Sequence, residues 1–217
     1  MTASAHPLWP LFDLVIRSER LVLRLPTDDG LVALAALARA GIHPPDEMPF
    51  AVPWSTLPSP AFETGFVQYH WLCRATWTPA SWTLNLAVEL DGELVGSQGI
   101  EAHDFAIVRT VSTGSWLGRA FQRRGIGTEM RAAVLGLAFD HLRAEIALTE
   151  ANVGNAGSNG VSLALGYEPN GLGRLAPGGR VNDTVRYRMT RETWADRPRP
   201  PITVEGLERC RGLFGIE

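Results

Sequence analysis

A glycine-containing loop in the middle of the chain reads Gln122-Arg123-Arg124-Gly125-Ile126-Gly127-Thr128. The residues before it predict a strand that ends near Leu117, and those after it predict a long helix. Glycine lets the backbone turn tightly, so several N–H groups can converge on one point. A helix start adds unpaired N–H donors and the positive end of the helix dipole. The loop is therefore predicted to bind a phosphate or pyrophosphate group.

Three other interpretations of this loop are weighed against that prediction. A Gly-x-Gly pair can form a tight strand-to-helix turn that binds nothing. A dinucleotide-binding loop has a third glycine, but Met130 occupies that position. The P-loop of nucleotide hydrolases needs a lysine, and all 20 basic residues of this chain are arginine, which excludes that class. Arg119, Arg123 and Arg124 supply positive charge around the loop instead.

The elements around the loop predict a mixed sheet with helices on both faces, in the α/β (α+β) class. Asp91-Gly92 is typical of a tight hairpin between two of the strands. Ser112, Gly114 and Ser115 interrupt a third strand, which predicts a bulge or a close approach by another group. Strands are expected at residues 20–25, 82–90, 93–100, 109–117, 146–150 and 184–190. Helices are expected at 28–40, capped by Asp28 or Asp29, and at 61–77, 126–143 and 155–165.

Composition limits the class of protein. The 217 residues fit one domain, here 1–217 with a core of about 17–196 and a C-terminal extension of 197–217. A net charge of −3 gives no indication of a nucleic-acid partner, and no apolar run is long enough to span a membrane. Two cysteines make no disulfide framework, and residues 1–6 carry no export signal, so a cytoplasmic location is expected. No His and Cys spacing suggests a metal site.

Four motifs together give the chain a family resemblance. The segment Gln122 to Gly127 matches the Gln/Arg-x-x-Gly-x-Gly/Ala signature of GNAT acyltransferases. Three further segments resemble motifs of the RimJ/RimL-like branch of that family: Arg20-Leu21-x-Leu23-Arg24, Thr128-Glu129-Met130, and Asn155-Ala156-Gly157-Ser158 followed by Leu165-Gly166-Tyr167. Their order and spacing are those of the branch over about residues 20–190.

The resemblance implies a fold and a co-substrate. The expected fold is a single domain with about seven mostly antiparallel strands, splayed into a V between the fourth and fifth. The pantetheine arm of an acyl-CoA, acetyl- or succinyl-CoA, would lie in the split and pair with the backbone of Trp116 and Leu117. Asn155 would bond the pantetheine, or cap a helix, or do both. The pyrophosphate would bind Gln122, Arg123, Arg124, Gly125, Ile126, Gly127 and Thr128.

The resemblance also implies that an amine attacks the thioester directly, without a covalent enzyme intermediate. The protein must then position the reactants, carry protons and stabilise the oxyanion. Ser158 is the candidate general acid for the leaving thiolate, with a helix-terminal or packing role as the alternative. Glu101 is the first candidate base, with Asp104 and Glu150 as alternatives, and Ser115 could position a water. His103, in an expected loop, and His141, on the core face of a helix, are not favoured.

The acceptor is expected to be a small-molecule or peptide amine. The proline-rich segment 44–60 falls where the family covers its substrate groove, so Phe50 and Trp54 are candidate substrate contacts. Trp82 is expected in the core and Trp116 in the cleft. Leu207, Cys210 and Phe214 recur at near-helical spacing, so the tail should pack on its own domain or on a second subunit of a homo-oligomer. The alternative function is a non-catalytic acyl-CoA-binding module.

Overall fold

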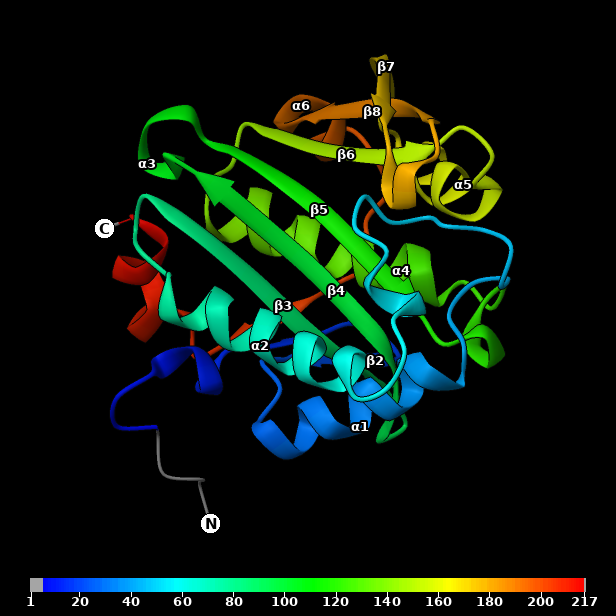
Figure 1. Cartoon of the computed structure of the whole chain (residues 1–217). Helices are drawn as coiled ribbons and strands as arrows, with labels where there is room; N and C mark the ends of the chain where they lie inside the picture. The colour runs from blue at the N-terminus through cyan, green and yellow to red at the C-terminus, as the bar shows by residue number, and fades with distance from the viewer. Residues whose placement is uncertain (1–5, 217) are drawn as a thin grey trace.

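The computed structural model describes residues 6–216, and within them one nine-stranded sheet has the order β7-β8-β6-β5-β4-β3-β2-β1-β9 (Figure 1). The strands are β1 Val15–Arg17, β2 Leu21–Arg24, β3 Ser81–Leu90, β4 Glu93–His103, β5 Thr110–Leu117, β6 Ile146–Asn152, β7 Glu168–Leu175, β8 Asn182–Thr190 and β9 Thr203–Glu205. The β5–β6 pair is parallel and the other described pairs are antiparallel. The expected mixed sheet is confirmed, but it has nine strands instead of about seven. Residues 1–5, most of the segment in which no export signal was expected, lie outside the described part.

Helices cover both faces of the sheet, as expected. They are α1 Asp28–Ala40, α2 Ala61–Ala75, α3 Phe105–Val108, α4 Ile126–Gly136, α5 Ala156–Leu165 and α6 Arg191–Ala195. Figure 1 shows α1 and α2 on one face and α4 on the other. Within residues 6–216, no helix has the length and apolar character needed to cross a membrane.

Two helix ends differ from the prediction. The cap of α1 is Thr27 instead of Asp28 or Asp29, because its Oγ1 accepts the Gly30 N–H at 3.2 Å. One helix was expected to run from the loop to Arg143. In the structure α4 ends at Gly136, and a π-helical turn follows over Leu137–His141. His141 is only partly buried there, so it does not belong to the core face on which it was placed.

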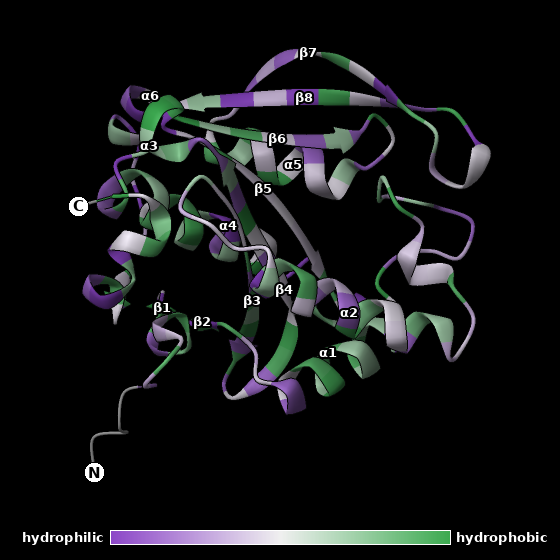
Figure 2. Ribbon diagram, turned by 60° about the vertical axis from the view of Figure 1, so that its left-hand side comes forward, coloured by the Kyte–Doolittle hydropathy of each residue, from purple (hydrophilic) through white to green (hydrophobic). Residues whose placement is uncertain are grey.

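The alternation along β3 explains the two apolar clusters of the molecule. Trp82, Leu84 and Leu86 point into the larger cluster, on the face covered by α4. Ala87 points into the smaller one, beneath α1 and α2, with Phe62 among its members. A strand with residues alternating between faces can bury both of them when helices pack on each side. The same alternation of hydrophilic and hydrophobic residues is visible along β8 in Figure 2.

The sheet opens between β5 and β6. The two strands pair only from Thr110 to Ser112, opposite Ile146 to Leu148. Beyond Ser112, β5 continues along β4 as far as Leu117, and β6 continues along β8. Residues 113–117 therefore have a strand partner on one side only, which is the splayed arrangement that the resemblance implied.

Of the two alternatives for the interrupted strand, a bulge or a close approach by another group, the bulge is contradicted. The β4–β5 register runs without a shift from Glu101 opposite Ser112 to Gly96 opposite Leu117. Gly114 faces Gly99 across these strands, so two residues without side chains lie next to each other, and a Cβ added to Gly114 would have no atom within 4 Å. Gly114 leaves space above the sheet instead of kinking it, whereas a Cβ added to Gly99 would lie 2.9 Å from Asn85 Oδ1.

The C-terminal tail packs on its own domain. Strand β9 pairs with β1 at the edge of the sheet, and a 3₁₀ helix over Leu207–Phe214 follows. The ring of Phe214 lies 4.9 Å from that of Trp82, centroid to centroid, inside the larger apolar cluster. Cys210 is completely buried beside it. Of the two alternatives, packing on its own domain or on a second subunit, the structure shows the tail packed on its own domain.

Candidate active site

The predicted phosphate-binding loop lies at the open end of the split between β5 and β6. After β5 ends at Leu117, a short 3₁₀ turn leads to Gly125, the residue before α4. Arg123 and Gly125 both have left-handed backbone conformations, with φ of 61° and 77°. The backbone N–H groups of residues 123–128 have no hydrogen-bond acceptor in the described part of the chain. Such a run of unpaired N–H groups at a helix start suits an anion.

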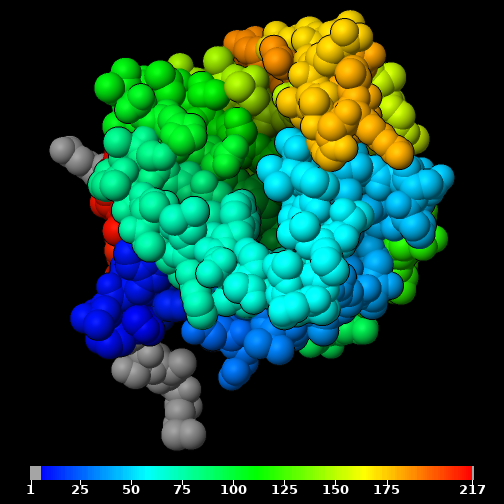
Figure 3. Space-filling view, viewed as in Figure 1, coloured from blue at the N-terminus to red at the C-terminus, as the bar shows by residue number. Residues whose placement is uncertain are grey.

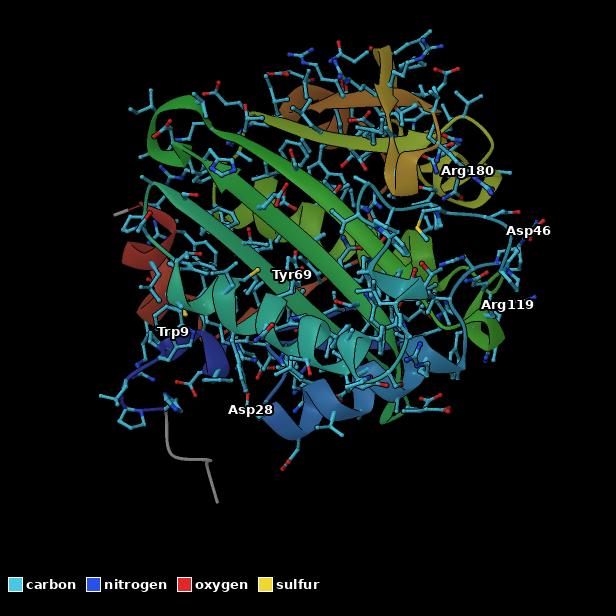
Figure 4. All side chains as sticks on the ribbon, in the orientation of Figure 1. Trp9, Asp28, Asp46, Tyr69, Arg119 and Arg180 are labelled. Carbon is cyan, nitrogen blue, oxygen red and sulfur yellow. The ribbon has the colours of Figure 1, made fainter. Side chains whose placement is uncertain are left out.

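Three arginines surround these N–H groups. Arg119, Arg123 and Arg124 are exposed, and none of them forms an ion pair within residues 6–216. Figure 4 shows Arg119 at the periphery of the molecule, next to the start of α4. Their positive charge is therefore available to a bound phosphate.

Gln122 holds the loop in place. Its Nε2 donates to the carbonyl oxygen of Ile42 at 2.8 Å and to that of Leu117 at 3.0 Å. The amide thus fastens the loop to the end of β5 and to the segment that follows α1. The Leu117 carbonyl, which the resemblance assigned to pantetheine, already accepts one hydrogen bond here and keeps its second lone pair.

Glu129 anchors the first turn of α4. Its carboxylate accepts hydrogen bonds from the Ser18 hydroxyl at 2.7 Å and from the Arg20 backbone N–H at 2.9 Å. Burial alone would raise the pKa of this carboxyl, but these bonds and the Arg20 guanidinium outweigh it and hold the pKa below its usual range. Glu129 is therefore ionised near neutral pH.

Helix α5 forms the opposite wall of the split. Asn155 caps it, because its Oδ1 accepts the Ser158 N–H at 3.0 Å. The Ser158 hydroxyl is partly buried and has no partner among residues 6–216. A Cβ added to Gly127 would lie 3.4 Å from Val161 Cγ2, so the loop and α5 are neighbours. The structure thus brings Ser158 and the loop to the same opening.

Sequence reasoning missed a buried polar network on the α4 side of β5. Arg131 of α4 is 2% exposed, and it donates from Nη2 to Ser115 Oγ at 3.0 Å and from Nη1 to Thr149 Oγ1 at 3.1 Å. The Tyr167 hydroxyl lies 3.3 Å from Thr113 Oγ1. Burial lowers the pKa of Arg131 and raises that of Tyr167, and each group opposes the shift of the other. A signal existed: the residues after Arg131 are apolar on every side of α4, which places this part of the helix in the core.

The other face of the same strands carries Glu101. It is exposed on β4, opposite Thr83 on one side and Ser112 on the other, at the level where β5 and β6 part. Tyr69 of α2 points over these strands (Figure 4), and its hydroxyl accepts from Asn85 Nδ2 at 3.3 Å. Burial, with Cys73 and Glu101 nearby, raises the pKa of Tyr69 to about 12, so Tyr69 stays protonated at neutral pH.

The other candidate bases are placed less favourably. Glu150 accepts a short hydrogen bond from Thr184 and lies 3.7 Å from Arg186 in an ion pair. Asp104 is exposed at the end of β4. His103 closes β4 instead of lying in a loop, and its Nδ1 is 2.9 Å from Ser81 Oγ.

The proline-rich segment 44–60 spans the open side of the split. Its Met48 carbonyl accepts from the side-chain amides of Asn152 on β6 and Asn182 on β8, at 2.8 Å and 3.1 Å. Trp54 packs among aromatic rings, 5.1 Å from Phe50 and 6.1 Å from Trp116 between centroids. Figure 3 shows a hollow between this segment (cyan), α2 (teal) and the β7–β8 region (yellow and orange), with the green strands as its floor.

Comparison with known proteins identifies this arrangement. The sequence pattern described as "Acetyltransferase (GNAT) domain" matches residues 20–168, which is more than half of the chain. The chain belongs to the GNAT acetyltransferase family. The family that the four motifs suggested is thereby confirmed.

Solved structures share the fold of this GNAT domain. Mycobacterium smegmatis RimJ in complex with CoA-disulfide is 22% identical with a TM-score of 0.68, covering 94% of this chain and 95% of that one. RimL, a ribosomal L7/L12 alpha-N-protein acetyltransferase in complex with coenzyme A, is 18% identical with a TM-score of 0.65, covering 81% and 97%. A GNAT-family acetyltransferase from Bacillus anthracis is 18% identical with a TM-score of 0.65, covering 82% and 99%. Both branch members named in the resemblance are thus among the proteins with this fold.

Proposed function

We propose that this GNAT domain is an acyl-CoA-dependent N-acyltransferase that joins an acyl group to an amine by direct attack in a ternary complex. One observation carries the proposal. The backbone N–H groups of residues 123–128, at the start of α4, have no acceptor in the described part of the chain and lie at the open end of a split sheet. Each hydrogen bond to a charged oxygen contributes roughly 1.5–3 kcal/mol, so a few of them hold a pyrophosphate without lysine.

The acyl-CoA would lie along the split. The pyrophosphate binds residues 122–128, with the arginines neutralising its charge, and the pantetheine follows the backbone of Trp116 and Leu117 on the unpaired side of β5. Asn155 reaches the same arm from the cap of α5. The thioester then comes to rest deeper in the split, near Ser115 and Ser158.

At the thioester, the amine nitrogen attacks the carbonyl carbon and the C–N bond forms. When the intermediate collapses, the C–S bond breaks and the thiolate leaves with the electron pair. Ser158 is proposed to give the thiolate its proton, since its hydroxyl has no other partner among residues 6–216. Glu101 is proposed to take the amine proton, and a water positioned by Ser115 is the alternative acceptor of that proton.

The acceptor would enter through the hollow over β4 and β5, beside Phe50 and Trp54. A small-molecule or peptide amine fits an opening of this kind, and an acetyl or succinyl group fits the donor side. No cluster of three or more metal-ligating side chains is found among residues 6–216, and the proposed chemistry uses none. A cytoplasmic setting, where acyl-CoA is available, is part of the proposal, as is assembly into a homo-oligomer.

A thiol-release screen tests the proposal. Acetyl-, propionyl- and succinyl-CoA are each combined with a panel of peptide and small-molecule amines, and free thiol is measured against time. Release that requires both the protein and one amine supports the transferase. Calorimetric binding of CoA without release for any pair would replace it with a non-catalytic acyl-CoA-binding module. Absence of CoA binding would exclude both.

A further inference from the structure

Arg131 carries a positive charge into the protein core without a negative partner. Its side chain is 2% exposed, and no carboxylate within residues 6–216 forms an ion pair with it. Its hydrogen bonds go to the hydroxyls of Ser115 and Thr149, the Tyr167 hydroxyl lies near enough to interact with it, and its Nε is buried without a partner. A buried charge is costly unless it is compensated. A charge retained in this form suits a site where negative charge develops during function.

The hydrogen bonds fix the direction of each hydroxyl proton. A guanidinium can only donate, so the oxygens of Ser115 and Thr149 both act as acceptors towards Arg131. The Thr149 hydroxyl donates its own hydrogen bond to the Thr113 carbonyl oxygen at 3.0 Å. The Ser115 proton has no acceptor among residues 6–216. Ser115 is thus the one of these two hydroxyls whose proton remains available.

Arg131 also makes Ser115 a stronger donor. A hydrogen bond from a charged group polarises the hydroxyl that accepts it, and that hydroxyl then donates more strongly onward. Ser115 is only partly buried, whereas Arg131 behind it is enclosed. The Arg131 charge therefore polarises the Ser115 hydroxyl, which lies towards the less buried side of β5.

Ser115 lies where the split begins to widen. It is three residues past Ser112, the last residue of β5 that pairs with β6, and two residues before Leu117, where the strand ends. Gln98 faces it across the β4–β5 pair, and the Gln98 Oε1 is also buried without a partner. Two residues next to Ser115 thus each have a buried polar atom without a partner: Oε1 of Gln98 and Nε of Arg131.

We propose that Arg131 is a positioning residue for acyl transfer, which holds the Ser115 hydroxyl so that it donates to the thioester carbonyl oxygen. This inference rests on the proposed function. As the amine nitrogen bonds to the carbonyl carbon, the C=O π pair moves onto that oxygen, and the Ser115 hydrogen bond strengthens there. Collapse restores the carbonyl and expels the thiolate. Ser115 gives up no proton in these steps, and Arg131 touches no substrate.

The test compares Arg131→Met, Ser115→Ala and the double variant with the wild-type protein. Methionine fills the core without a charge, and replacing a buried charge by an apolar group is often neutral or stabilising. We expect Tm to be unchanged or raised in Arg131→Met. We expect kcat to fall by about 10²-fold in each single variant, while calorimetric CoA affinity changes by less than about twofold. The double variant should be no slower than the slower single one, because both residues act as one unit.

A spectroscopic readout separates this role from packing. Acyl-CoA labelled with ¹³C at the thioester carbonyl gives an isotope-shifted infrared band, which hydrogen-bond donation moves to lower frequency. We expect this shift in the wild-type complex and its loss in Arg131→Met and Ser115→Ala. Thr149→Val is the matched control, since it removes the other hydroxyl that binds Arg131 but leaves Ser115 in place. It should keep the carbonyl shift.

The outcomes distinguish the inference from the function on which it rests. If the wild-type protein releases no thiol from any acyl-CoA, the proposed function fails. If it turns over and Arg131→Met keeps both its kcat and its carbonyl shift, the function stands and the inference is overturned. If Arg131→Met slows only a donor with a carboxylated acyl chain such as succinyl-CoA, Arg131 recognises that carboxylate instead, which also overturns the inference.

Discussion

The carboxylate of Glu129 binds both the backbone N–H and the Nε of Arg20, at 2.9 Å and 2.7 Å. The two residues are 109 positions apart, and each belongs to one of the four motifs on which the family resemblance depended. The Arg20 guanidinium also reaches the Arg124 carbonyl of the loop, at 3.4 Å. The first strand of the family pattern thus holds the loop at residues 122–128 and the start of α4 together.

Replacing Glu129 by Gln should weaken this junction. The amide keeps the shape of the side chain but cannot accept three hydrogen bonds with a negative charge, so we expect the free energy of unfolding to fall by about 1–2 kcal/mol. The pKa of Glu129 is lowered in the folded protein, so the stabilisation exists above the unfolded pKa and is lost as the pH falls through the folded pKa, below 4.5. Urea unfolding at pH 7 and at pH 3 measures both effects.

Glu89→Gln provides the control for this prediction. Glu89 pairs with Arg24 at 3.1 Å on the β2–β3 pair, and the Arg24 side chain is 45% exposed. Exposed pairs of this kind contribute little. Equal losses in the two variants would show that Glu129 has no special part in holding the loop.

Gly127→Val should block CoA without unfolding the protein. The φ of Gly127 lies outside the left-handed range, and its added Cβ would meet only Val161 Cγ2 and Leu117 Cδ1, at 3.4 Å and 3.7 Å. Under the proposed function, the valine side chain would occupy the space in which a pyrophosphate approaches the backbone. We expect calorimetric CoA affinity to fall at least tenfold, about 1.4 kcal/mol, with an unchanged circular dichroism spectrum.

Gly125→Val should also lose CoA binding, but it is the less clean test. Gly125 has a φ of 77°, so valine there strains the backbone in addition to blocking the ligand. Gly160→Ala on α5 is the control, because its added Cβ has no atom within 4 Å. Full CoA binding by both loop variants would remove the assignment of this loop to pyrophosphate.

Ser158→Ala should lower kcat while CoA affinity stays nearly intact. A proton donated to the leaving thiolate matters mainly in the transition state, so its loss affects turnover more than ground-state binding. The cap of α5 is Asn155, which receives the backbone N–H of Ser158 and not its hydroxyl. Removing the hydroxyl therefore leaves the cap in place, and an unaffected kcat would assign Ser158 to packing.

His70 should make the stability of the fold depend on pH. Burial, with the Arg74 charge nearby, lowers the pKa of His70 to about 4. The unfolded chain binds the proton near pH 6.5, so stability is complete above that pH and falls as the pH drops towards 4. We expect a loss of about 2 kcal/mol at pH 5 relative to pH 7.

The variant His70→Phe should remove this part of the pH dependence. Phenylalanine keeps the ring next to Phe66, which lies 4.9 Å away between centroids, but cannot take up a proton. The control replaces the exposed His103 by Gln and should keep the wild-type profile. The test measures urea unfolding midpoints between pH 7 and pH 4.5. Midpoints that fall equally with pH in wild type and His70→Phe would contradict the prediction.

Local patterns made much of the fold predictable. Asp91 and Gly92 predicted a hairpin, and their φ values of 52° and 81° are those of a tight turn with both central residues left-handed. Strand β7 escaped prediction because Pro169 and Gly171 are unfavourable in strands, and β8 holds it by pairing. β1 and β9 have only three residues each, too few for a periodic pattern.

The site was predictable where its residues are contiguous in the sequence. The loop at residues 122–128 follows one strand and starts one helix, so its geometry is local. The bond from Arg131 to Thr149 joins a helix to a strand 18 residues away, and only the packed structure brings the two together. Glu150 was a candidate base because it lies near the end of a strand beside the split. The sequence could not show that Thr184 and Arg186 already bind its carboxylate.

The last prediction concerns which amine the protein acylates. A lysine-like amine has a pKa of about 10.4 and an α-amine one of about 7.7–8.0. At pH 7, deprotonating the amine to its neutral, nucleophilic form therefore costs roughly 4.6 kcal/mol for the lysine-like amine and about 1.2 kcal/mol for the α-amine. An enzyme for the first kind needs a strong, shielded base. Glu101 is exposed, Glu150 is paired with Arg186, and His103 is bound to Ser81.

We therefore expect acceptors of lower pKa, such as peptide α-amines, to be preferred. The measurement is a competition on one peptide that carries a free N-terminus and an internal lysine, with the position of the acyl group read by mass spectrometry. The same peptide with a blocked N-terminus is the control, and its acylation should be far slower. If the acyl group were found only on the lysine at neutral pH, the energetic argument would fail, and a shielded base elsewhere in the cleft would have to offset the cost of deprotonating the lysine.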